Sequence, residues 1–525
     1  MERLVGTLQS VFSDYRAILS TLAIIVFCSR VLRHPLKKYP GPFIATLTNG
    51  YSGYHASKKR LHLATFQDHV KYGPVVRQAP NRLVFNTVTA FQDIYLNPNV
   101  HKSTIYELTQ FNPEKNIFGT LDRERHRKKR KLYGKILSEK SLRTFAPTMS
   151  AEVDIFLRQL LSCKYKAINM SPLCERLTAD IAGHLAFGQP LHTQTEATNR
   201  LFPRAMTSMN AVVSLFMAWP ALSNIWPILR RLNKKNNIAF VGALQRIITA
   251  RITLPKTAKH DFYSIAIDDQ APEEESLTRT EIWAEAVFFL PAGGTTTSTA
   301  LSATFFYLSR HPIVYAKLAN EIRTTFESGR AIETGPLLSG CRYLRAVIDE
   351  TLRIAPPFVG TFWREPDQSY KGSFVVDGHV IPPGTIVGVN PYSLMHNEKY
   401  FPHPFQFRPE RWLDDTEDEE QLGVRALSRR AFIPFAAGET GCLGKNMAYH
   451  EASLMVAKTL WYFDFQSPLG EAGQLGEGQP GRTDGRDRKD EYQLYDIATA
   501  DHDGPNLIFK PREGFCRDLI LGTGS

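Results

Sequence analysis

The 525-residue chain has only six cysteines, and none of them stands close to another. No Cys-x-x-Cys spacing occurs, so the sequence lacks the metal-binding motif of that type. The wide spacing also argues against a disulfide framework and favours a reducing compartment. Each cysteine therefore has to be interpreted on its own.

Long apolar runs are also scarce near the N-terminus. Residues 17–27 are almost continuously apolar, which is short of the ~20 residues needed to cross a bilayer. Arg16 and Arg30 can snorkel and lengthen this segment. A cleavable signal peptide is the alternative, but no small-residue cleavage site is obvious and the basic residues follow the run. We therefore expect residues 1–38 to be an uncleaved membrane anchor with a basic flank, and the rest to be cytosolic.

Acidic residues are outnumbered, 52 against 63 Lys and Arg, which gives a formal net charge of +11. Such a balance suggests acidic partners or an anionic membrane surface. The densest basic segment is 123–131, with seven basic residues and one acid, Glu124. Taken alone, this segment is either a solvated helix face or a nucleic-acid patch.

The segment 432–444 places one cysteine, Cys442, in a loop rich in glycine, directly before an amphipathic stretch that begins at Lys445. A helix N-terminus offers a positive dipole end and unpaired N–H groups that stabilise a thiolate. Glycines allow the backbone to turn tightly and to approach a flat, bulky group, against which Phe435 would pack. A lone cysteine is more often a small buried hydrophobe. The alternative is an axial thiolate ligand of haem.

The spacing Phe-x-x-Gly-x-x-x-Cys-x-Gly resembles the haem-binding loop of the cytochrome P-450 superfamily, the haem-thiolate monooxygenases. The family usually has Arg or His two residues before the cysteine, where this chain has Thr440, so this propionate contact is weaker or made elsewhere. His126-x-x-x-Arg130 falls where many members have Trp-x-x-x-Arg, and Arg364 falls where the family often binds a propionate. The resemblance implies a haem b site formed by Cys442, Phe435, Gly438, Gly444, Arg130, His126 and Arg364, with Cys442 as the metal ligand.

A long helix is expected to begin at the capping box Thr278-x-x-Glu281 and to end near Ser309. Its centre, 291–297, contradicts helix propensity, because Pro291 removes a backbone hydrogen bond and is followed by two glycines and three threonines. A plain proline kink is one interpretation. The other is the family's oxygen-binding groove, with Thr296 and Thr295 as the catalytic pair, although Thr295 replaces the usual acid. The substrate-cavity candidates are Phe288, Phe289, Ala292, Phe358 and Val359.

Glu350 and Arg353 stand three apart on a predicted helix, which alone is a weak signal. The later segment 407–412, Phe-Arg-Pro-Glu-Arg-Trp, resembles the family motif whose arginine locks such a pair. We therefore expect Glu350, Arg353 and Arg411 to form a buried triad near the cysteine loop, since buried charges must be paired.

The resemblance covers nearly the whole chain and implies a mainly α fold with a small β region, with haem between the long helix and the cysteine loop. Residues 39–525 would be the catalytic domain, with a proline hinge at 39–42 and a disordered insertion at 468–490. The expected partners are NADPH–cytochrome P-450 reductase with cytochrome b5 as an additional donor, O2, a small apolar substrate and the endoplasmic reticulum membrane, and no nucleic acid.

The implied reaction is oxidation of a small apolar molecule in secondary metabolism, as in filamentous fungi. A haem-thiolate isomerase or dehydratase is the first alternative, which the missing acid at Thr295 permits and the basic segment opposes. A non-catalytic haem sensor is the second, which the retention of Thr296 opposes.

Overall fold

The computed structural model describes residue 21 and residues 33–110, 113–163, 165–232, 234–266, 277–367, 369–413 and 418–521. The expected anchor segment 17–27 therefore lies almost wholly outside the described residues. Within the described ranges, no helix combines the length and the apolar character that a membrane span requires.

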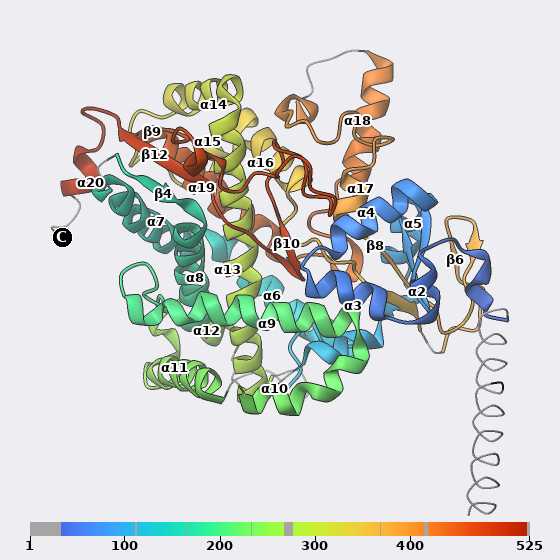
Figure 1. Ribbon diagram of the computed structural model, residues 1–525. Helices are drawn as coiled ribbons and strands as arrows, with labels where there is room; N and C mark the ends of the chain where they lie inside the picture. Colours follow the sequence, from blue (N-terminus) through green and yellow to red (C-terminus); the bar gives the residue numbers. More distant parts are fainter. Residues whose placement is uncertain are drawn as a thin grey trace, which may run out of the picture.

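The central element is helix α13 (Arg279–Arg310), whose 32 residues cross the body of the molecule (Figure 1). Its N-terminus is the predicted capping box: the Thr278 hydroxyl accepts from the Glu281 N–H, and the Glu281 carboxylate accepts from the Thr278 N–H. The helix runs its expected length and continues through Pro291. Hydroxyl groups of the threonines that follow bind backbone carbonyls one turn back.

Helices pack around α13 on several sides, and their apolar faces form one large core with it. The neighbours are α7 (Glu139–Ser162), α8 (Met170–Phe187), α16 (Arg342–Ile354) and α19 (Lys445–Tyr462). In α16 the buried stripe is Leu344, Val347, Ile348 and Leu352, which is the helical spacing seen in the sequence. Further helices are α2 (Phe43–Leu47), α3 (Gly50–Ser57), α4 (Leu61–Tyr72), α5 (Val88–Tyr95), α6 (Arg123–Ile136), α9 (Leu201–Ala218), α10 (Trp226–Leu232), α11 (Lys234–Ile252), α12 (Phe262–Ala266), α14 (Pro312–Thr325), α15 (Pro336–Ser339), α17 (Pro391–Met395), α18 (Glu419–Ala431) and α20 (Arg517–Leu521).

A small β region lies beside the helical body, as expected (Figure 1). Its main sheet has the strand order β1-β2-β8-β5-β3, and β1 and β2 form an antiparallel hairpin. The strands are β1 (Val75–Ala79), β2 (Arg82–Phe85), β8 (Ile386–Val389), β5 (Arg364–Pro366) and β3 (Val100–Lys102). The side chains of this sheet and α5 build a second apolar core.

Three smaller sheets complete the fold. The pairs are β6 (Val375–Val376) with β7 (His379–Val380), and β10 (Tyr495–Ile497) with β11 (Thr499–Asp501). In the third sheet, β12 (Asn506–Pro511) lies between β4 (Ala167–Asn169) and β9 (Phe463–Gln466). The β10–β11 hairpin lies close to α13 and α9, so it belongs to the centre of the molecule.

The segment 468–490, expected to be a disordered insertion, is instead packed against the fold. It contains a short 3-10 helix (Glu471–Gln474), and Arg310 at the end of α13 pairs with Glu477 at 3.1 Å and donates to the Gly473 carbonyl at 2.7 Å. Arg486 within the segment is buried and donates to the carbonyls of Lys59 and Leu494. Composition failed here because polar contacts, rather than an apolar core, hold the segment.

The proline hinge at 39–42 also contacts the body. Tyr39 is buried in the second core, and the Pro40 carbonyl accepts from the Arg77 N–H at 2.8 Å. A Cβ on Gly41 would lie 2.4 Å from the Arg77 carbonyl oxygen, so glycine is required for this close approach.

Candidate functional site

The cysteine loop leads from a buried apolar segment into the N-terminus of α19. The Cys442 N–H donates to the Phe435 carbonyl at 2.8 Å, which closes the loop on itself. Gly438 has φ of +68°, and a Cβ there would lie 2.2 Å from the Tyr95 carbonyl oxygen. Only glycine fits this position. Phe435 packs on Tyr449 of α19, with ring centroids 5.3 Å apart.

Cys442 is the one exposed cysteine among the described cysteines, whereas Cys174, Cys341 and Cys516 are buried. Burial raises the pKa of its thiol, while N–H groups of Gly444 and Lys445 and the Arg130 guanidinium lower that pKa. These two observations agree if the sulfur lies inside the molecule and faces an internal space rather than the outer surface. Such a sulfur, at a helix N-terminus with N–H groups directed at it, fits the axial thiolate of a haem.

Cationic side chains gather beside this loop. Arg130 of α6 donates to the Gly441 carbonyl at 2.8 Å, and Arg364 of β5 donates to the Thr440 hydroxyl at 2.6 Å. Thr440, which replaces the family's cation, therefore holds another cation in place. A cavity of about 250 Å³ opens at this end of the loop and is lined by Arg364, His126, Thr440 and residues of α5 and β3. The donors match the carboxylates of haem propionates.

His126 lines this cavity as a neutral ring. Its side chain is buried in α6, and burial together with the charges of Lys102 and Arg130 lowers the pKa of its imidazole to about 3. His126 can therefore contribute a hydrogen bond in this cavity rather than a charge.

Lys102 of β3 was missed in the sequence. Its buried ammonium donates to the carbonyls of Ile117, Phe118 and Thr120, and burial with the nearby Arg364 charge lowers its pKa to about 7. No local motif marks this residue, because its partners come from a separate loop.

The threonines of α13 lie on two faces of the helix. The Thr296 hydroxyl donates to the Ala292 carbonyl at 2.7 Å. The Thr295 hydroxyl donates to the Pro291 carbonyl at 2.7 Å and lies 3.2 Å from the Thr499 hydroxyl of β11. Both side chains are half-buried, whereas Thr297 is buried.

The five cavity candidates divide in the structure. Phe288, Ala292 and Phe358 are half-buried; Phe288 stacks on Phe118, with centroids 5.7 Å apart. Phe289 instead packs in the core between Tyr133 and Phe262, because adjacent helical residues point about 100° apart. Val359 is fully buried, and its carbonyl accepts from Asn390. These last two side chains are buried, whereas the other three are partly accessible.

The structure brings Glu350, Arg353 and Arg411 together. Arg353 donates to Glu350 from Nε and Nη2, each at 2.9 Å, and Arg411 Nε donates to Glu350 at 3.1 Å. Trp412 Nε1 and the Arg408 N–H complete the shell around this carboxylate. Trp412 in turn packs on Phe432 at the start of the cysteine loop, with centroids 4.6 Å apart.

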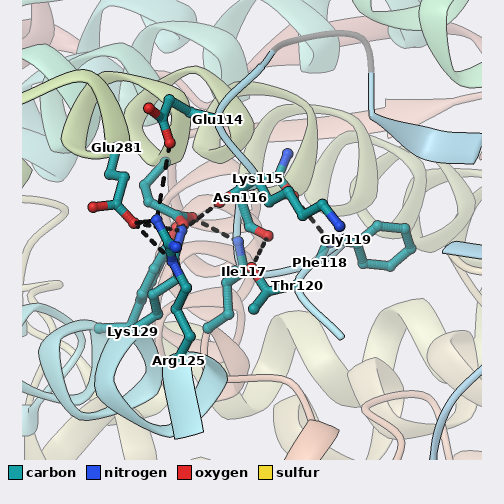
Figure 2. A network of polar contacts seen from close by, with 12 residues as sticks. Glu114, Lys115, Asn116, Ile117, Phe118, Gly119, Thr120, Arg125, Lys129 and Glu281 are labelled. Atoms are coloured by element: carbon teal, nitrogen blue, oxygen red, sulfur yellow. Dashed lines mark hydrogen bonds and ion pairs between the residues drawn. The ribbon is translucent and has the colours of Figure 1, made fainter. Parts of the chain in front are cut away.

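Figure 2 shows how one face of α6 is tied to α13 and to the loop 114–120. Lys129, fully buried, donates to Glu285 of α13 at 2.6 Å, and that carboxylate also accepts from the Ile117 N–H at 2.9 Å and from the Tyr133 hydroxyl. Arg125 pairs with Glu281 at 2.5 Å. Lys129, which the sequence placed on a basic docking face, is therefore an internal residue.

The body is mainly helical and is crossed by one long helix. Beside it, a cysteine loop lies at a helix N-terminus with arginines next to it. These features are those of a haem-thiolate protein. The comparisons agree: the cytochrome P-450 family model matches residues 40–478, and the chain belongs to that family. Members carry haem with a cysteine thiolate as axial ligand.

Several curated fungal proteins are similar along nearly their whole length. Cytochrome P-450 monooxygenase atnE of Emericella nidulans is 33% identical over 94% of this chain and 95% of its own. Cytochrome P-450 monooxygenase AKT7 of Alternaria alternata is 32% identical over 93% of this chain and 95% of its own. Cytochrome P-450 monooxygenase poxM of Penicillium oxalicum is 33% identical over 94% and 93%. The protein is an oxidoreductase that incorporates oxygen from O2, and it uses redox partners and a small substrate.

Proposed function

We propose that Cys442 is the axial thiolate and that the enzyme hydroxylates or otherwise oxidises a small apolar molecule in secondary metabolism. The observation that carries this proposal is the position of Cys442 directly before the N-terminus of α19, in a loop closed by its N–H on the Phe435 carbonyl and held by Arg130 through the Gly441 carbonyl. The similarity to fungal monooxygenases supports the substrate class.

The haem supplies activation of O2 when it is bound, and the chain's own residues supply position and environment. Arg130, Arg364 and the neutral His126 ring hold its carboxylates at the cavity beside Thr440. Phe435 packs on the proximal side. Phe288, Ala292 and Phe358 contribute an apolar wall that excludes water.

Thr296 moves protons on the opposite side. Its hydroxyl bonds the Ala292 carbonyl in the resting helix, and a hydroxyl can both donate and accept. We expect it to rotate from this carbonyl and to hold the water that delivers protons to the reacting oxygen. Thr295 cannot act as a carboxylic acid and instead links α13 to Thr499.

Electrons come from NADPH through a membrane-bound cytochrome P-450 reductase, with cytochrome b5 as an additional donor. The exposed cations of α6, Arg127, Lys131 and Lys135, stand four apart and form a face suited to an acidic donor. The apolar run at 17–27 and its basic flank anchor the enzyme in the endoplasmic reticulum membrane, with the catalytic domain in the cytosol. The isomerase or dehydratase alternative is disfavoured by the relatives named monooxygenase.

Two variants test the proposal. The ferrous carbonyl complex of the parent should show the absorption band characteristic of a thiolate ligand, and Cys442→Ser should lose both this band and turnover. Cys163→Ser, at a half-buried cysteine of the α7 terminus, is the matched control and should keep both. A Cys442→Ser enzyme with the thiolate band would refute the ligand assignment.

Thr296→Ala should keep the carbonyl band but release more hydrogen peroxide per NADPH consumed, because the proton path is lost. Thr295→Asp, which restores the family's acid, should be tolerated. If Thr296→Ala releases the same amount of hydrogen peroxide per NADPH as the parent, proton delivery does not use this threonine. Turnover without NADPH would then favour an isomerase.

A further inference from the structure

A small, partly open cavity lies beside Thr295, between α8, α9, α13 and the β10–β11 hairpin. It measures about 10 Å³, the space of about one water-sized probe. Its polar lining includes Glu175 of α8, Thr295 and Ser298 of α13, and Thr499 of β11. The proposed function uses none of these side chains except Thr295.

The hydroxyl groups in this cavity are already arranged in a chain. Thr499 Oγ1 accepts from Asn210 Nδ2 at 2.7 Å and lies 3.2 Å from Thr295 Oγ1. Thr295 directs its hydrogen to the Pro291 carbonyl at 2.7 Å. Because the nearer acceptor of the Thr295 hydrogen is the Pro291 carbonyl, Thr499 can direct its own hydrogen to the Thr295 oxygen or to a group on the cavity side.

Glu175 is the acid that reaches this space. Its carboxylate has no hydrogen-bond partner among the described residues, which is unusual for a half-buried carboxylate. Burial, followed by the charges of Asp501 and Asp503, raises its pKa to about 7. The group can therefore both hold and release a proton at neutral pH.

We propose that Glu175 replaces the acid that α13 lacks at Thr295, and that it relays protons through one cavity water to the hydroxyls of Thr499 and Thr295. This inference rests on the proposed function. Glu175 acts through other groups, so it is a positioning residue of the proton path.

Each transfer in this path balances. Glu175 gives its proton to the water, the water gives one of its own to the Thr499 hydroxyl, and that hydroxyl passes its hydrogen to Thr295. Thr295 in turn gives its own hydrogen to the water that Thr296 holds in the proposed function, so one proton moves inward and no electron moves. Asp501, with a side chain 24% exposed and paired to Lys59 at 2.8 Å, returns a proton from solvent to Glu175.

The charged groups around Glu175 come from three directions. Asp501 and Asp503 face it from the end of β11, and both raise its pKa. Arg176, on its own helix, lowers that pKa. His502 on the cavity wall stays neutral, because burial lowers the pKa of its ring to about 4. Glu175 is thus the group of this cavity that changes charge near pH 7.

The first test does not depend on turnover. In the resting holoenzyme, infrared spectroscopy should show a protonated-carboxyl band that disappears with a midpoint near pH 7. Glu175→Gln should remove this band. Glu451→Gln is the matched control, because Glu451 is a buried acid of α19 outside the cavity lining, and burial raises its pKa to about 8. Glu451→Gln should keep the carboxyl band whose midpoint is near pH 7 and should lose a different carboxyl band.

The second test measures the fate of electrons in the holoenzyme with a fungal reductase, NADPH and no added substrate. In the parent, peroxide released per NADPH should rise as the pH increases through about 7. In Glu175→Gln the share of electrons that ends in water should fall by about tenfold and should no longer depend on pH. This decrease is smaller than the ~10²-fold effect of a lost general acid, because bulk water still supplies protons. Glu175→Asp should restore part of the parent's pH profile.

Thr499→Val keeps Glu175 and breaks the path, so it should retain the infrared band and show the same loss of water formation, while Thr499→Ser should behave like the parent. This pair also decides the matter if Glu175→Gln fails to fold. An unchanged electron fate in Glu175→Gln or Thr499→Val would overturn the relay while leaving the monooxygenase assignment intact. A parent without the thiolate carbonyl band would instead overturn the proposed function.

Discussion

The two faces of α6 carry the same kinds of residue and do different work. On the inner face, Lys129 is fully buried against Glu285, and Arg130 reaches the Gly441 carbonyl. On the outer face, Arg127 and Lys131 are exposed, and Arg127 pairs with Glu439 of the cysteine loop at 2.8 Å. Adjacent positions in one basic run thus differ completely in environment.

Burial decides what each charge contributes. An exposed ion pair contributes roughly 0–1 kcal/mol, because water solvates both partners and salt screens them. A buried cation must instead be compensated, and Lys129 is compensated by a carboxylate and the Lys115 carbonyl. The inner face therefore holds the structure and the cofactor end together, and the outer face remains available to a partner.

The largest expected effect follows from removal of the inner lysine. Lys129→Met leaves the Glu285 carboxylate buried without its cation and should lower the free energy of unfolding by about 3–5 kcal/mol. Lys128→Met, one residue away with its side chain 42% exposed, should change it by less than ~0.5 kcal/mol. Urea unfolding at pH 7 measures both.

The double variant Lys129→Met/Glu285→Leu sharpens this test, since it removes the unpaired charge as well. We expect it to regain a large part of the lost stability, because apolar groups can replace a buried ion pair at little cost. Equal losses for Lys129→Met and Lys128→Met would contradict the contrast between the two faces.

The second effect concerns haem retention. Arg130→Ala removes a charge-assisted bond to the cysteine loop and a propionate partner, and should weaken haem binding by about 1.5–3 kcal/mol. Lys131→Ala, the next residue and exposed, is its control and should bind haem like the parent. Transfer of haem to an acceptor protein measures both, and equal transfer rates would remove Arg130 from the site.

The sequence predicted the architecture where a motif is local. The capping box Thr278-x-x-Glu281 located the start of α13. Glu350, Arg353 and Arg411 were brought together as expected, because each lies in a recognisable motif.

The residues that the sequence did not reveal depend on contacts between distant segments of the chain. Lys129 looks like its neighbours in a basic run, and only the packing of α6 on α13 shows that Glu285 faces it. Lys102 and Glu175 likewise carry no motif, and their environments are set by loops and helices far along the chain. The contact of Phe289 with Tyr133 likewise depends on helix rotation, which residue type alone does not reveal.

A smaller effect is expected at the boundary between the faces, where a half-exposed Arg125 pairs with a buried Glu281. Arg125→Ala should lower the free energy of unfolding by about 1 kcal/mol at pH 7. This loss is larger than for an exposed ion pair and smaller than for a buried one. Backbone and guanidinium hydrogen bonds hold the pKa of Glu281 below its usual value despite its burial.

The sign of the pH dependence follows from that lowered pKa. The folded state binds the Glu281 proton less tightly than the unfolded state, so this stabilisation is present above the ordinary pKa and is lost as the pH falls through the folded value. The difference between Arg125→Ala and the parent should therefore shrink in acid unfolding experiments below about pH 4. A constant difference down to pH 3 would show that Arg125 acts by packing alone.

The smallest effect is expected on the outer face and concerns rate rather than stability. Lys131→Glu should leave the free energy of unfolding within ~0.5 kcal/mol of the parent, because its side chain is exposed. Reduction by the reductase should slow several-fold at low salt, since an acidic donor meets one more like charge. This difference in reduction rate should shrink at ~0.5 M salt, because the screening length is then shorter than the ~8 Å of physiological solution.

Lys166→Glu is the control, because Lys166 is exposed in the loop before β4 and the variant makes the same charge change away from α6. It should be reduced at the parent's rate. If Lys131→Glu and Lys166→Glu slow reduction equally, the effect belongs to net charge, and the outer face of α6 is not the docking surface.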